Sequence, residues 1–308
     1  MVSEAPHVGL IGCGGWGKNI LRDLKALGAR VSCVAPGDRS RANAEANGAD
    51  LIISTLAELP EVEGVVVATG SDSHGEVLLA LAGRGIPMFV EKPLTSDLPT
   101  ARRLLEVAPD RIFVMDKWRY HAGINRIAGF ANSREIGDVV GLRLFRVGWS
   151  MTHNEIDPIW NLLPHDLSIC LHVLGDLPPL QAAFADGLGP AAGGVLAVLG
   201  REMGPRIVIE TSAHHPVNRR SAILACTGGT VTLNGSMDDH LILRRGAPGA
   251  FEAVETSVPI ENVMPLEAEL AVFLRHLRGG PAPMSSVAEG ALIVERVWDI
   301  RRAVGLPN

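Results

Sequence analysis

Short apolar runs alternate with amphipathic stretches through residues 7–115, and this alternation limits the possible folds more than any other feature. The apolar runs have the length of strands and lie at His7–Ile11, Val31–Ala35, Leu51–Ile53, Gly64–Ala68, Met88–Val90 and Ile112–Met115. The segments between them have helical periodicity and lie at Lys18–Leu27, Ser40–Asn47, His74–Ala82 and Thr100–Val107. Strands that alternate with helices predict a parallel, doubly wound sheet.

A glycine-rich hexapeptide, Gly-Cys-Gly-Gly-Trp-Gly at residues 12–17, follows the first strand and fits the pattern G-x-G-x-x-G. In a first strand-to-helix turn, the glycines allow a tight turn, close approach of the backbone to a pyrophosphate, and close packing of helix on strand. The amino terminus of the following helix attracts phosphate charge. We therefore predict a dinucleotide site that includes Gly12, Gly14, Gly15, Trp16 and Gly17. A purely structural turn is the alternative.

The end of the second strand bears on which dinucleotide binds. An acidic residue about 20 residues after the glycines usually bonds the adenosine ribose, but here the strand ends in Val34-Ala35-Pro36. Arg39, Ser40 and Arg41 follow, and a guanidinium pairs well with a 2′-phosphate. We expect these three residues to contact the cofactor and predict NADP. NAD is the alternative, because Asp38 is close enough to reach a free ribose.

The regular alternation of strands and helices ends at Asp116, and beyond it the strand-like runs lie closer together in the sequence. Helices are expected at Ile124–Ser133, His165–Leu174, Leu266–Leu277 and Ser285–Val304, and strands at Val139–Val147, Ile207–Thr211, Ala222–Cys226 and Thr230–Leu233. Gly228-Gly229 is a hairpin signal and favours antiparallel pairing. The sequence therefore predicts an α/β protein. Residues 1–118 are expected to form a Rossmann domain with a doubly wound parallel sheet, and residues 119–308 an α+β domain for substrate binding and oligomerisation with a large open, mostly antiparallel sheet.

Composition and residue spacing exclude several classes of partner. The net charge is −6 and no basic block is present, so no nucleic-acid partner is expected. The apolar, glycine-rich segment Gly187–Gly200 is 14 residues long, shorter than the ~20 residues that cross a bilayer, so no membrane partner is expected. No metal site is predicted, because the four cysteines lack paired spacing and His214-His215 has no carboxylate or cysteine at ligand spacing. The amino-terminal residues lack the features of a secretory signal, which predicts a cytoplasmic location.

Two segments of the first domain carry a family resemblance. Val65–His74 contains Ala-Thr-Gly and ends in a histidine, and a helix and a strand then lead to Glu91-Lys92-Pro93. In these motifs and their spacing the chain resembles the glucose–fructose oxidoreductase, inositol dehydrogenase and MocA (Gfo/Idh/MocA) family. The resemblance implies that Thr69 and His74 line the cofactor cleft, and that Glu91, Lys92 and Pro93 place the lysine beside the nicotinamide and the reacting carbon.

The resemblance continues into the second domain. Arg119-Tyr120 follow the sixth strand, and the segment Trp160–Ser168 reads Trp-Asn-Leu-Leu-Pro-His-Asp-Leu-Ser. The resemblance implies a cofactor contact for Arg119 and substrate contacts for Lys92, Tyr120, Trp160, Asn161, His165 and Asp166. The chain departs from the family pattern twice. Asn161 stands where an aspartate is commoner, which bears on the proton chemistry, and Gly70 replaces a proline.

Moving a hydride between an alcohol carbon and a nicotinamide requires a group that takes or gives the hydroxyl proton. Lys92 follows a buried strand and precedes a rigid proline, so desolvation favours its neutral amine. His165 is expected at a helix start after Pro164, and imidazole changes charge near neutral pH. Lys92 and His165 are therefore the predicted catalytic residues, and either one can be the proton-transfer group. The alternatives are a surface lysine and a structural histidine.

The family resemblance implies an NAD(P)-dependent oxidoreductase that acts on CH–OH groups, with a secondary alcohol or ketone of a sugar or nucleotide-linked sugar as substrate. Two alternatives stay open. One is a cofactor-binding sensor with little catalysis, which Asn161 would fit, and the other is an imine reductase of the same family. Because only two helices follow the strands of the second domain, one sheet face is expected to be uncovered and apolar. An uncovered apolar face predicts a homodimer or homotetramer.

Overall fold

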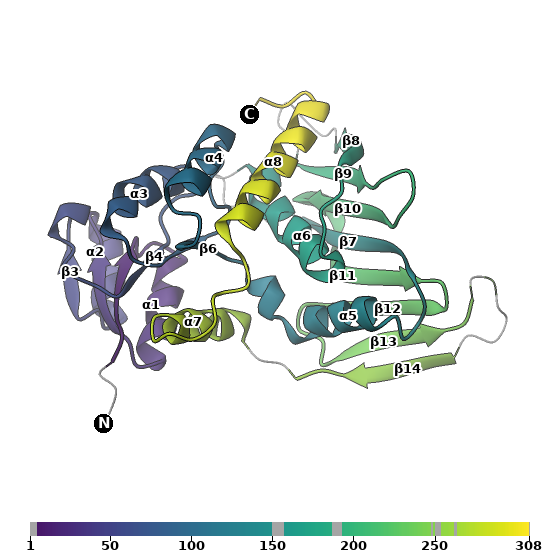
Figure 1. The fold of residues 1–308 in the computed structure, drawn as a ribbon, viewed down its shortest axis with the longest axis horizontal. Coiled ribbons are helices and arrows are strands. Elements are labelled where there is room, and N and C mark those ends of the chain that lie inside the picture. The colour runs from purple at the N-terminus through teal and green to yellow at the C-terminus, as the bar shows by residue number, and fades with distance from the viewer. Residues whose placement is uncertain are drawn as a thin grey trace. The chain divides into compact units, whose positions relative to one another are not determined.

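The structure is a computed structural model that describes residues 5–149, 157–186, 193–247, 249, 254–261 and 264–307. The chain divides into two compact units (Figure 1). Unit 1 contains residues 1–117 and 264–294, and unit 2 contains residues 118–263 and 295–308. The first change of unit lies next to the boundary expected from the sequence. The return of residues 264–294 to unit 1 differs from that expectation.

Unit 1 is built on a six-stranded parallel sheet with the strand order β3-β2-β1-β4-β5-β6. Its strands are β1 (His7–Ile11), β2 (Arg30–Val34), β3 (Leu51–Ile53), β4 (Gly64–Val67), β5 (Met88–Glu91) and β6 (Ile112–Met115). The connecting helices are α1 (Gly17–Ala26), α2 (Asp38–Ala46), α3 (His74–Leu81) and α4 (Leu98–Val107). The order reverses between β1 and β4, where doubly wound sheets bind their ligands. The predicted Rossmann sheet is confirmed.

Helix α7 (Pro265–His276) belongs to unit 1 because its apolar side packs on the parallel sheet. The ring of Phe273 stacks on Phe89 of β5, with 5.0 Å between the centroids. Leu270 and Phe273 are fully buried in the same core as Ile20 and Leu24 of α1. The sequence shows that this helix is amphipathic but does not show which sheet its apolar side covers.

Unit 2 contains an eight-stranded sheet with the order β14-β13-β12-β11-β7-β10-β9-β8. Its strands are β7 (Val139–Trp149), β8 (Leu180–Ala185), β9 (Gly194–Leu199), β10 (Arg206–Ser212), β11 (His214–Cys226), β12 (Gly229–Leu233), β13 (His240–Arg245) and β14 (Val254–Pro259). Among the described strands of this sheet, only β7 and β10 pair in parallel. The predicted mostly antiparallel sheet is confirmed, but the sequence analysis missed β8, β9, β13 and β14.

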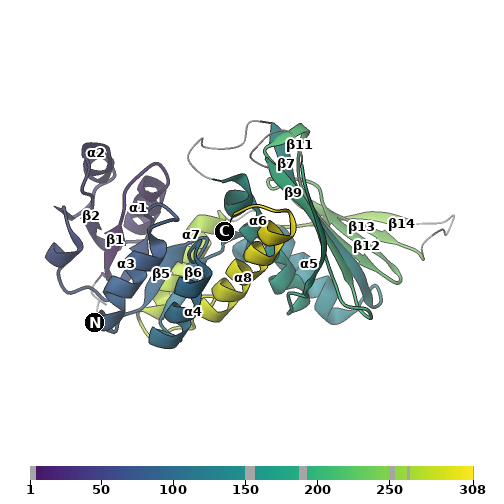
Figure 2. The ribbon, with the colours of Figure 1, turned by 90° about the horizontal axis from the view of Figure 1, so that it is seen from above.

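Helices α5 (Ala122–Ser133) and α6 (Pro158–Leu174) lie on one face of the unit 2 sheet (Figure 2). On the opposite face, Phe184 of β8 stands in register with Leu196 of β9, and their exposed fractions are 63% and 37%. Among the described residues of unit 2, no helix covers this second face. The last helix, α8 (Val287–Ala303), contributes residues to both units. None of the helices in the described ranges combines the length and the apolar composition that a bilayer crossing requires.

The helix predicted at His165–Leu174 begins seven residues earlier, at Pro158. The Asp157 carboxylate accepts hydrogen bonds from the backbone N–H groups of Ile159 (2.8 Å) and Trp160 (3.3 Å), and a proline at the first helical position needs no partner for an N–H. Pro164 therefore lies inside the helix. The expectation that His165 stands at the helix start was wrong, because the Asp157-Pro158 start signal precedes it.

Candidate functional site

The loop between β1 and α1 requires glycine at two positions. Gly12 has a φ of +95°, and a Cβ there would lie 2.8 Å from the carbonyl oxygen of Ala68. A Cβ on Gly17 would lie 2.3 Å from the carbonyl oxygen of Gly12. The first glycine thus allows β1 and β4 to approach each other at the switch point, and the second allows α1 to start directly against the loop.

The middle of the same loop is open. A Cβ on Gly14 or Gly15 would find no other heavy atom within 4 Å. Helix α1 begins after Trp16 without a side-chain cap and without an acidic residue in its first turn. Bare backbone at a helix amino terminus is the surface that a pyrophosphate needs, so this loop fits a dinucleotide.

Asn43 of α2 fixes the loop from the side. Its Nδ2 donates to the carbonyl oxygens of Cys13 (2.9 Å) and Gly14 (3.3 Å). The sequence analysis missed this residue, because an asparagine in a polar helix gives no signal of a contact made about 30 residues away.

The three residues predicted to select the cofactor differ in their surroundings. The Ser40 hydroxyl donates to the carbonyl oxygen of Gly37 (2.7 Å) and so closes the start of α2. Arg41 donates to the hydroxyl of Ser54 (2.9 Å). Arg39 is exposed, and within the described ranges its guanidinium makes no hydrogen bond or ion pair. Arg39 is therefore the cation best able to meet a phosphate.

His74 joins the loops that follow β4 and β5. Its ring is 1% exposed, with Nδ1 2.8 Å from the carbonyl oxygen of Pro93 and Nε2 3.1 Å from that of Thr69. Burial lowers the pKa of His74. The Ser73 hydroxyl also donates to the Thr69 hydroxyl (2.8 Å). With both ring nitrogens next to carbonyl oxygens, His74 holds the loops after β4 and β5 together.

The Glu91-Lys92-Pro93 turn follows β5 and is tied to the glycine loop. The indole N–H of Trp16 donates to the Glu91 carboxylate, which also accepts from the backbone N–H of Lys92 (3.2 Å). The Lys92–Pro93 peptide bond is cis. Burial raises the pKa of Glu91, while the positive charge of Lys92 and the Trp16 hydrogen bond oppose this shift. Trp16 is thus brought next to the Glu91-Lys92 pair, although it lies 75 residues before Glu91 in the sequence.

In unit 2, the predicted substrate residues gather on α6 and the turn before α5. Asn161 and His165 are both half-buried and lie four residues apart on α6, one turn from each other on the same face. Trp160 is 8% exposed, and the Arg301 guanidinium lies 6.0 Å from its ring centroid. Tyr120 ends the short 3₁₀ helix Lys117–Tyr120.

Two further predicted residues make buried structural contacts. Both oxygens of Asp166 accept hydrogen bonds from the Arg146 guanidinium of β7, at 2.9 to 3.1 Å. Arg119 is 2% exposed and donates through Nε to the Ser168 hydroxyl (2.9 Å). These contacts hold α6 to its surroundings, a use of Asp166 and Arg119 that the sequence analysis did not anticipate.

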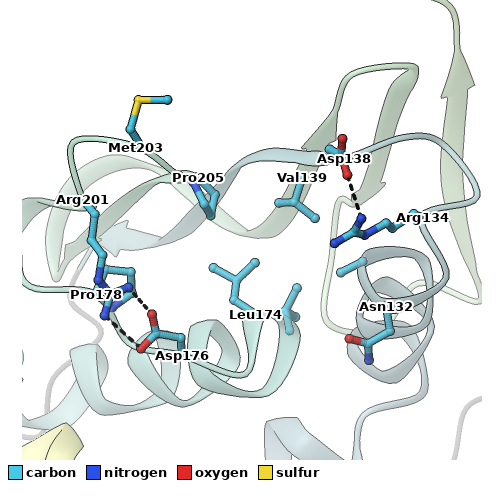
Figure 3. Close-up of a pocket in the computed structure, with 13 residues that line it drawn as sticks. Asn132, Arg134, Asp138, Val139, Leu174, Asp176, Pro178, Arg201, Met203 and Pro205 are labelled. Carbon is cyan, nitrogen blue, oxygen red and sulfur yellow. Dashed lines mark hydrogen bonds and ion pairs between the residues drawn. The ribbon is translucent and has the colours of Figure 1, made fainter.

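A cavity of about 330 Å³ opens at the carboxyl-terminal ends of α5 and α6 (Figure 3). None of the predicted site residues lines it. Its arginines are paired, Arg134 with Asp138 at 3.3 Å and Arg201 with Asp176, and between them lie apolar side chains such as Val139 and Leu174. Within the described ranges, no group of three or more histidine, cysteine, aspartate or glutamate residues is arranged to hold a metal ion.

Comparison with known proteins agrees with the geometry of unit 1. Residues 7–113 match the model of the GFO_IDH_MocA family, described as an oxidoreductase family with an NAD-binding Rossmann fold. An inositol 2-dehydrogenase from Streptomyces avermitilis is 33% identical over 112 residues, which is 34% of this chain and 33% of the relative. The comparison confirms the resemblance of the parallel-sheet region to the Gfo/Idh/MocA oxidoreductase family. The matched stretch spans about a third of that relative's length.

The fold of the whole chain has counterparts among solved structures. A UDP-N-acetylglucosamine 3-dehydrogenase from Acidithiobacillus ferrooxidans superposes with a TM-score of 0.84 at 19% identity, covering 97% of this chain and 98% of the other. A levoglucosan dehydrogenase in complex with NADH and levoglucosan gives 0.84 at 17% identity, covering 97% of each chain. At these sequence identities, both similarities concern the fold alone.

Proposed function

We propose that this chain is a member of the Gfo/Idh/MocA family and an NAD(P)-dependent oxidoreductase that transfers hydride between a nicotinamide cofactor and a secondary alcohol or ketone of a sugar. The observation that carries the proposal is the linkage of three loops at the carboxyl ends of β1, β4 and β5. The Trp16–Glu91 bond links the loops after β1 and β5, and the contacts of His74 with Thr69 and Pro93 link the loops after β4 and β5. A phosphate-binding loop and a lysine-bearing turn held together in this way are the parts that dinucleotide chemistry needs.

The cofactor would lie along the glycine loop. Backbone N–H groups near Gly14, Gly15 and Trp16 would hold the pyrophosphate, because this part of the loop is open and the helix start is uncapped. When bound, the nicotinamide supplies the hydride chemistry, by taking or giving a hydride at its ring. The Glu91–Trp16 bond keeps the following lysine at a fixed distance from the loop.

Lys92 is the proposed proton-transfer group, holding or releasing a proton at Nζ. The Glu91 carboxylate accepts a hydrogen bond from the Lys92 backbone N–H and so holds the backbone of the turn that carries this side chain. His165 is proposed to assist at the substrate, with Asn161 one helical turn away as its hydrogen-bonding neighbour. An asparagine side chain donates and accepts hydrogen bonds but does not ionise, so the proton chemistry falls to Lys92 and His165.

We infer NADP as the preferred cofactor. The ribose-binding acid is missing at Ala35, and Arg39 at the start of α2 is exposed. The family description and the NADH-bound neighbour name NAD, so the preference depends on Arg39 in this chain. A nucleotide-linked sugar is the proposed substrate, on the resemblance of the Trp160–Ser168 segment, and the fold likeness to a UDP-N-acetylglucosamine dehydrogenase is in keeping with it.

A homodimer or homotetramer is part of the proposal. The unit 2 sheet has one face without a helix in the described ranges, and large apolar side chains such as Phe184 stand on it. Water-exposed apolar area of this kind is usually covered by a second copy of the chain.

The test of the function is Lys92→Ala with Lys25→Ala as control, since Lys25 lies on α1 in an ion pair with Asp50. Turnover of nucleotide sugars and polyols is measured together with cofactor binding by nicotinamide fluorescence. We expect Lys92→Ala to lose about 10²- to 10⁴-fold in kcat, with cofactor affinity little changed, because one acid–base group is removed. Full turnover in Lys92→Ala would refute the assignment.

A cofactor-binding sensor is the second candidate, favoured by Asn161 in place of the usual acid. It predicts tight cofactor binding without turnover of any sugar, and no change in behaviour when Asn161 is replaced by Asp. The oxidoreductase proposal instead predicts that Asn161→Asp alters the pH dependence of turnover, since the new carboxylate lies one turn from His165 on α6.

A further inference from the structure

Glu269 of α7 is an acidic residue in an otherwise apolar stripe. Its neighbours along the buried side of the helix are Leu266, Leu270 and Phe273, and the glutamate itself is 1% exposed. Its Oε2 atom is buried and has no hydrogen-bond partner within the described ranges. A buried carboxyl oxygen without a partner is costly, so its retention needs a reason.

The packing of α7 on the sheet places Glu269 beside the lysine-bearing turn. Phe273 stacks on Phe89 at 5.0 Å, and Glu269 lies one helical turn before Phe273. Glu91 lies two residues after Phe89 and so points to the same face of β5. A Cβ on Gly64, at the start of β4, would lie 2.7 Å from Leu277, which directly follows α7, so the helix runs antiparallel to the strands. From the Phe273–Phe89 stack, four residues back along the helix cover ~6 Å and two residues forward along the strand cover ~6.6 Å, so the two glutamates reach the same level of the sheet.

A third carboxyl group and a lysine complete the surroundings. Asp116 follows β6, is 2% exposed and accepts a hydrogen bond from the Ser285 hydroxyl (3.1 Å). Lys117 comes next, with its Nζ 4.9 Å from the centroid of the Trp16 ring. We call Glu91, Asp116, Lys117 and Glu269 the carboxylate cluster. It adjoins the backbone of Lys92 through Glu91.

Protonation is the way in which a buried, unpartnered carboxyl group avoids its desolvation cost. Burial raises the pKa of Glu269 well above its usual value, the negative charges of Glu91 and Asp116 raise it further, and Lys117 opposes them. Helix α1 also packs on α7, and its charged residues are Lys18, Arg22, Asp23 and Lys25. Arg22 pairs with Asp23, and Lys25 with Asp50, so three of these four charges are already balanced.

We propose that Glu269 is a positioning residue for Lys92: it holds a proton in the resting protein, releases it as the pH rises, and thereby makes the carboxylate cluster more negative. The proposal rests on the proposed function, because it assigns Lys92 a proton to lose. The negative charge that Glu269 gains on losing its proton stabilises the Lys92 ammonium. Lys92 therefore loses its proton at higher pH, and over a wider pH range, than it would beside a residue that stays neutral.

The protonation is tested by stability, using Glu269→Gln, which copies a neutral carboxyl group in size. Glu267→Gln is the control, because Glu267 is exposed on the same helix. Above pH 4.5, the usual pKa of glutamate, the folded wild type keeps a proton that the unfolded chain has lost. Wild-type stability therefore falls as the pH rises toward the folded pKa of Glu269.

The Glu269→Gln variant should not lose stability in this way as the pH rises. The ratio of its folding equilibrium constant to that of the wild type should therefore increase by up to about tenfold per pH unit above pH 4.5. Urea unfolding from pH 4.5 to 9 measures the ratio. Glu267→Gln should show no such trend. A ratio for Glu269→Gln that is constant with pH, or a variant less stable than the wild type throughout, would overturn the proposal, because Glu269 would then be an ionised and bonded carboxylate.

The effect on Lys92 is tested by the pH profile of kcat/KM in the direction of alcohol oxidation, where rate rises as the base loses its proton. We expect Glu269→Gln to move the rising part of the kcat/KM profile about half a pH unit lower and to make it steeper. The reason is that the variant cannot develop a negative charge near Lys92 as the pH rises. An unchanged profile would overturn the tuning of Lys92. Full turnover in Lys92→Ala would instead overturn the proposed function, and the stability trend of Glu269→Gln would still report on the proton of Glu269.

Discussion

The Nδ1 atom of His74 lies 2.8 Å from the carbonyl oxygen of Pro93, the residue that follows the proposed catalytic lysine. The other ring nitrogen lies 3.1 Å from the carbonyl oxygen of Thr69. One buried imidazole therefore couples the loop after β4 to the turn after β5. The two loops belong to adjacent strands of the parallel sheet, so this side chain fixes how the lysine-bearing turn stands relative to the switch point.

His74→Ala should destabilise the protein by about 2–4 kcal/mol, since it leaves a cavity and removes the ring N–H that donates to one of these carbonyl oxygens. It should also weaken cofactor binding, because the Thr69 loop and the lysine turn lose their connection. Urea unfolding and NAD(P)H fluorescence titration measure the two effects. A variant that is less stable but binds cofactor with unchanged affinity would show that the His74 link is purely structural.

The pH dependence of stability should also reflect His74. Burial is the largest influence on its pKa and lowers it below 6.5. Below pH 6.5 the His74 ring is therefore protonated in the unfolded chain but stays neutral in the folded protein until the pH reaches the lower folded pKa. The contribution of His74 is complete above pH 6.5 and is lost as the pH falls toward the folded pKa. Unfolding free energies measured from pH 7 to 5 should fall less steeply in His74→Gln than in the wild type, and equal slopes would contradict the neutral buried ring.

Local patterns allowed most of unit 1 to be predicted. Strand length, helical period and the glycine turn are all set by residues that are neighbours in sequence, and the six strands of the parallel sheet lie where the apolar runs placed them. The edge strands of unit 2 escaped prediction for a physical reason. In β14 (Val254–Pro259) every residue is exposed except Val258, which is half-buried, so no apolar alternation marks the strand.

The start of α6 and the role of α7 show two different limits. The Asp157-Pro158 pair is a start signal that is present in the sequence, and it was overlooked in favour of Pro164. The place of α7 is a long-range property, because its stack on Phe89 joins residues 184 positions apart. Glu269 did have a local signal: it is a charged residue at a stripe position between Leu266 and Phe273, which a count of the helical face would have found.

Asp166 and Arg146 form a buried pair whose loss should be severe. Their side chains are 2% and 5% exposed, and the pair bonds through both carboxylate oxygens. Asp166→Ala leaves the guanidinium buried without its partner and should cost about 3–5 kcal/mol. Asp176→Ala is a matched control, because its pair with Arg201 is about half exposed and should contribute under about 1 kcal/mol. Thermal or urea unfolding compares them, and equal losses would show that burial of the pair is unimportant.

Arg39 should determine cofactor preference. Its guanidinium is exposed at the start of α2, next to the strand that lacks the ribose-binding acid. Arg39→Ala should weaken NADPH binding about 10- to 100-fold, the value of one lost charge-assisted contact, and leave NADH binding unchanged. Arg41→Ala is expected to have a smaller effect, since Arg41 already donates to Ser54. Isothermal titration with both cofactors measures the preference. A wild-type chain that binds NADH as tightly as NADPH would remove the basis for this assignment.

The uncovered face of the unit 2 sheet should hold the oligomer together. Phe184 and Leu196 stand side by side on β8 and β9, and both are more than a third exposed. A charge placed there would be desolvated on both copies of the chain in a two-fold interface, so Phe184→Asp should shift the protein toward monomer. Met203→Asp is the control, because Met203 is 87% exposed in the loop between β9 and β10 at the rim of the cavity in Figure 3.

Light scattering at micromolar concentration gives the mass of each variant. We expect a dimer or tetramer for the wild type and Met203→Asp, and a lower mass for Phe184→Asp. A monomeric wild type would contradict the proposed assembly, and an unchanged mass in Phe184→Asp would place the interface elsewhere.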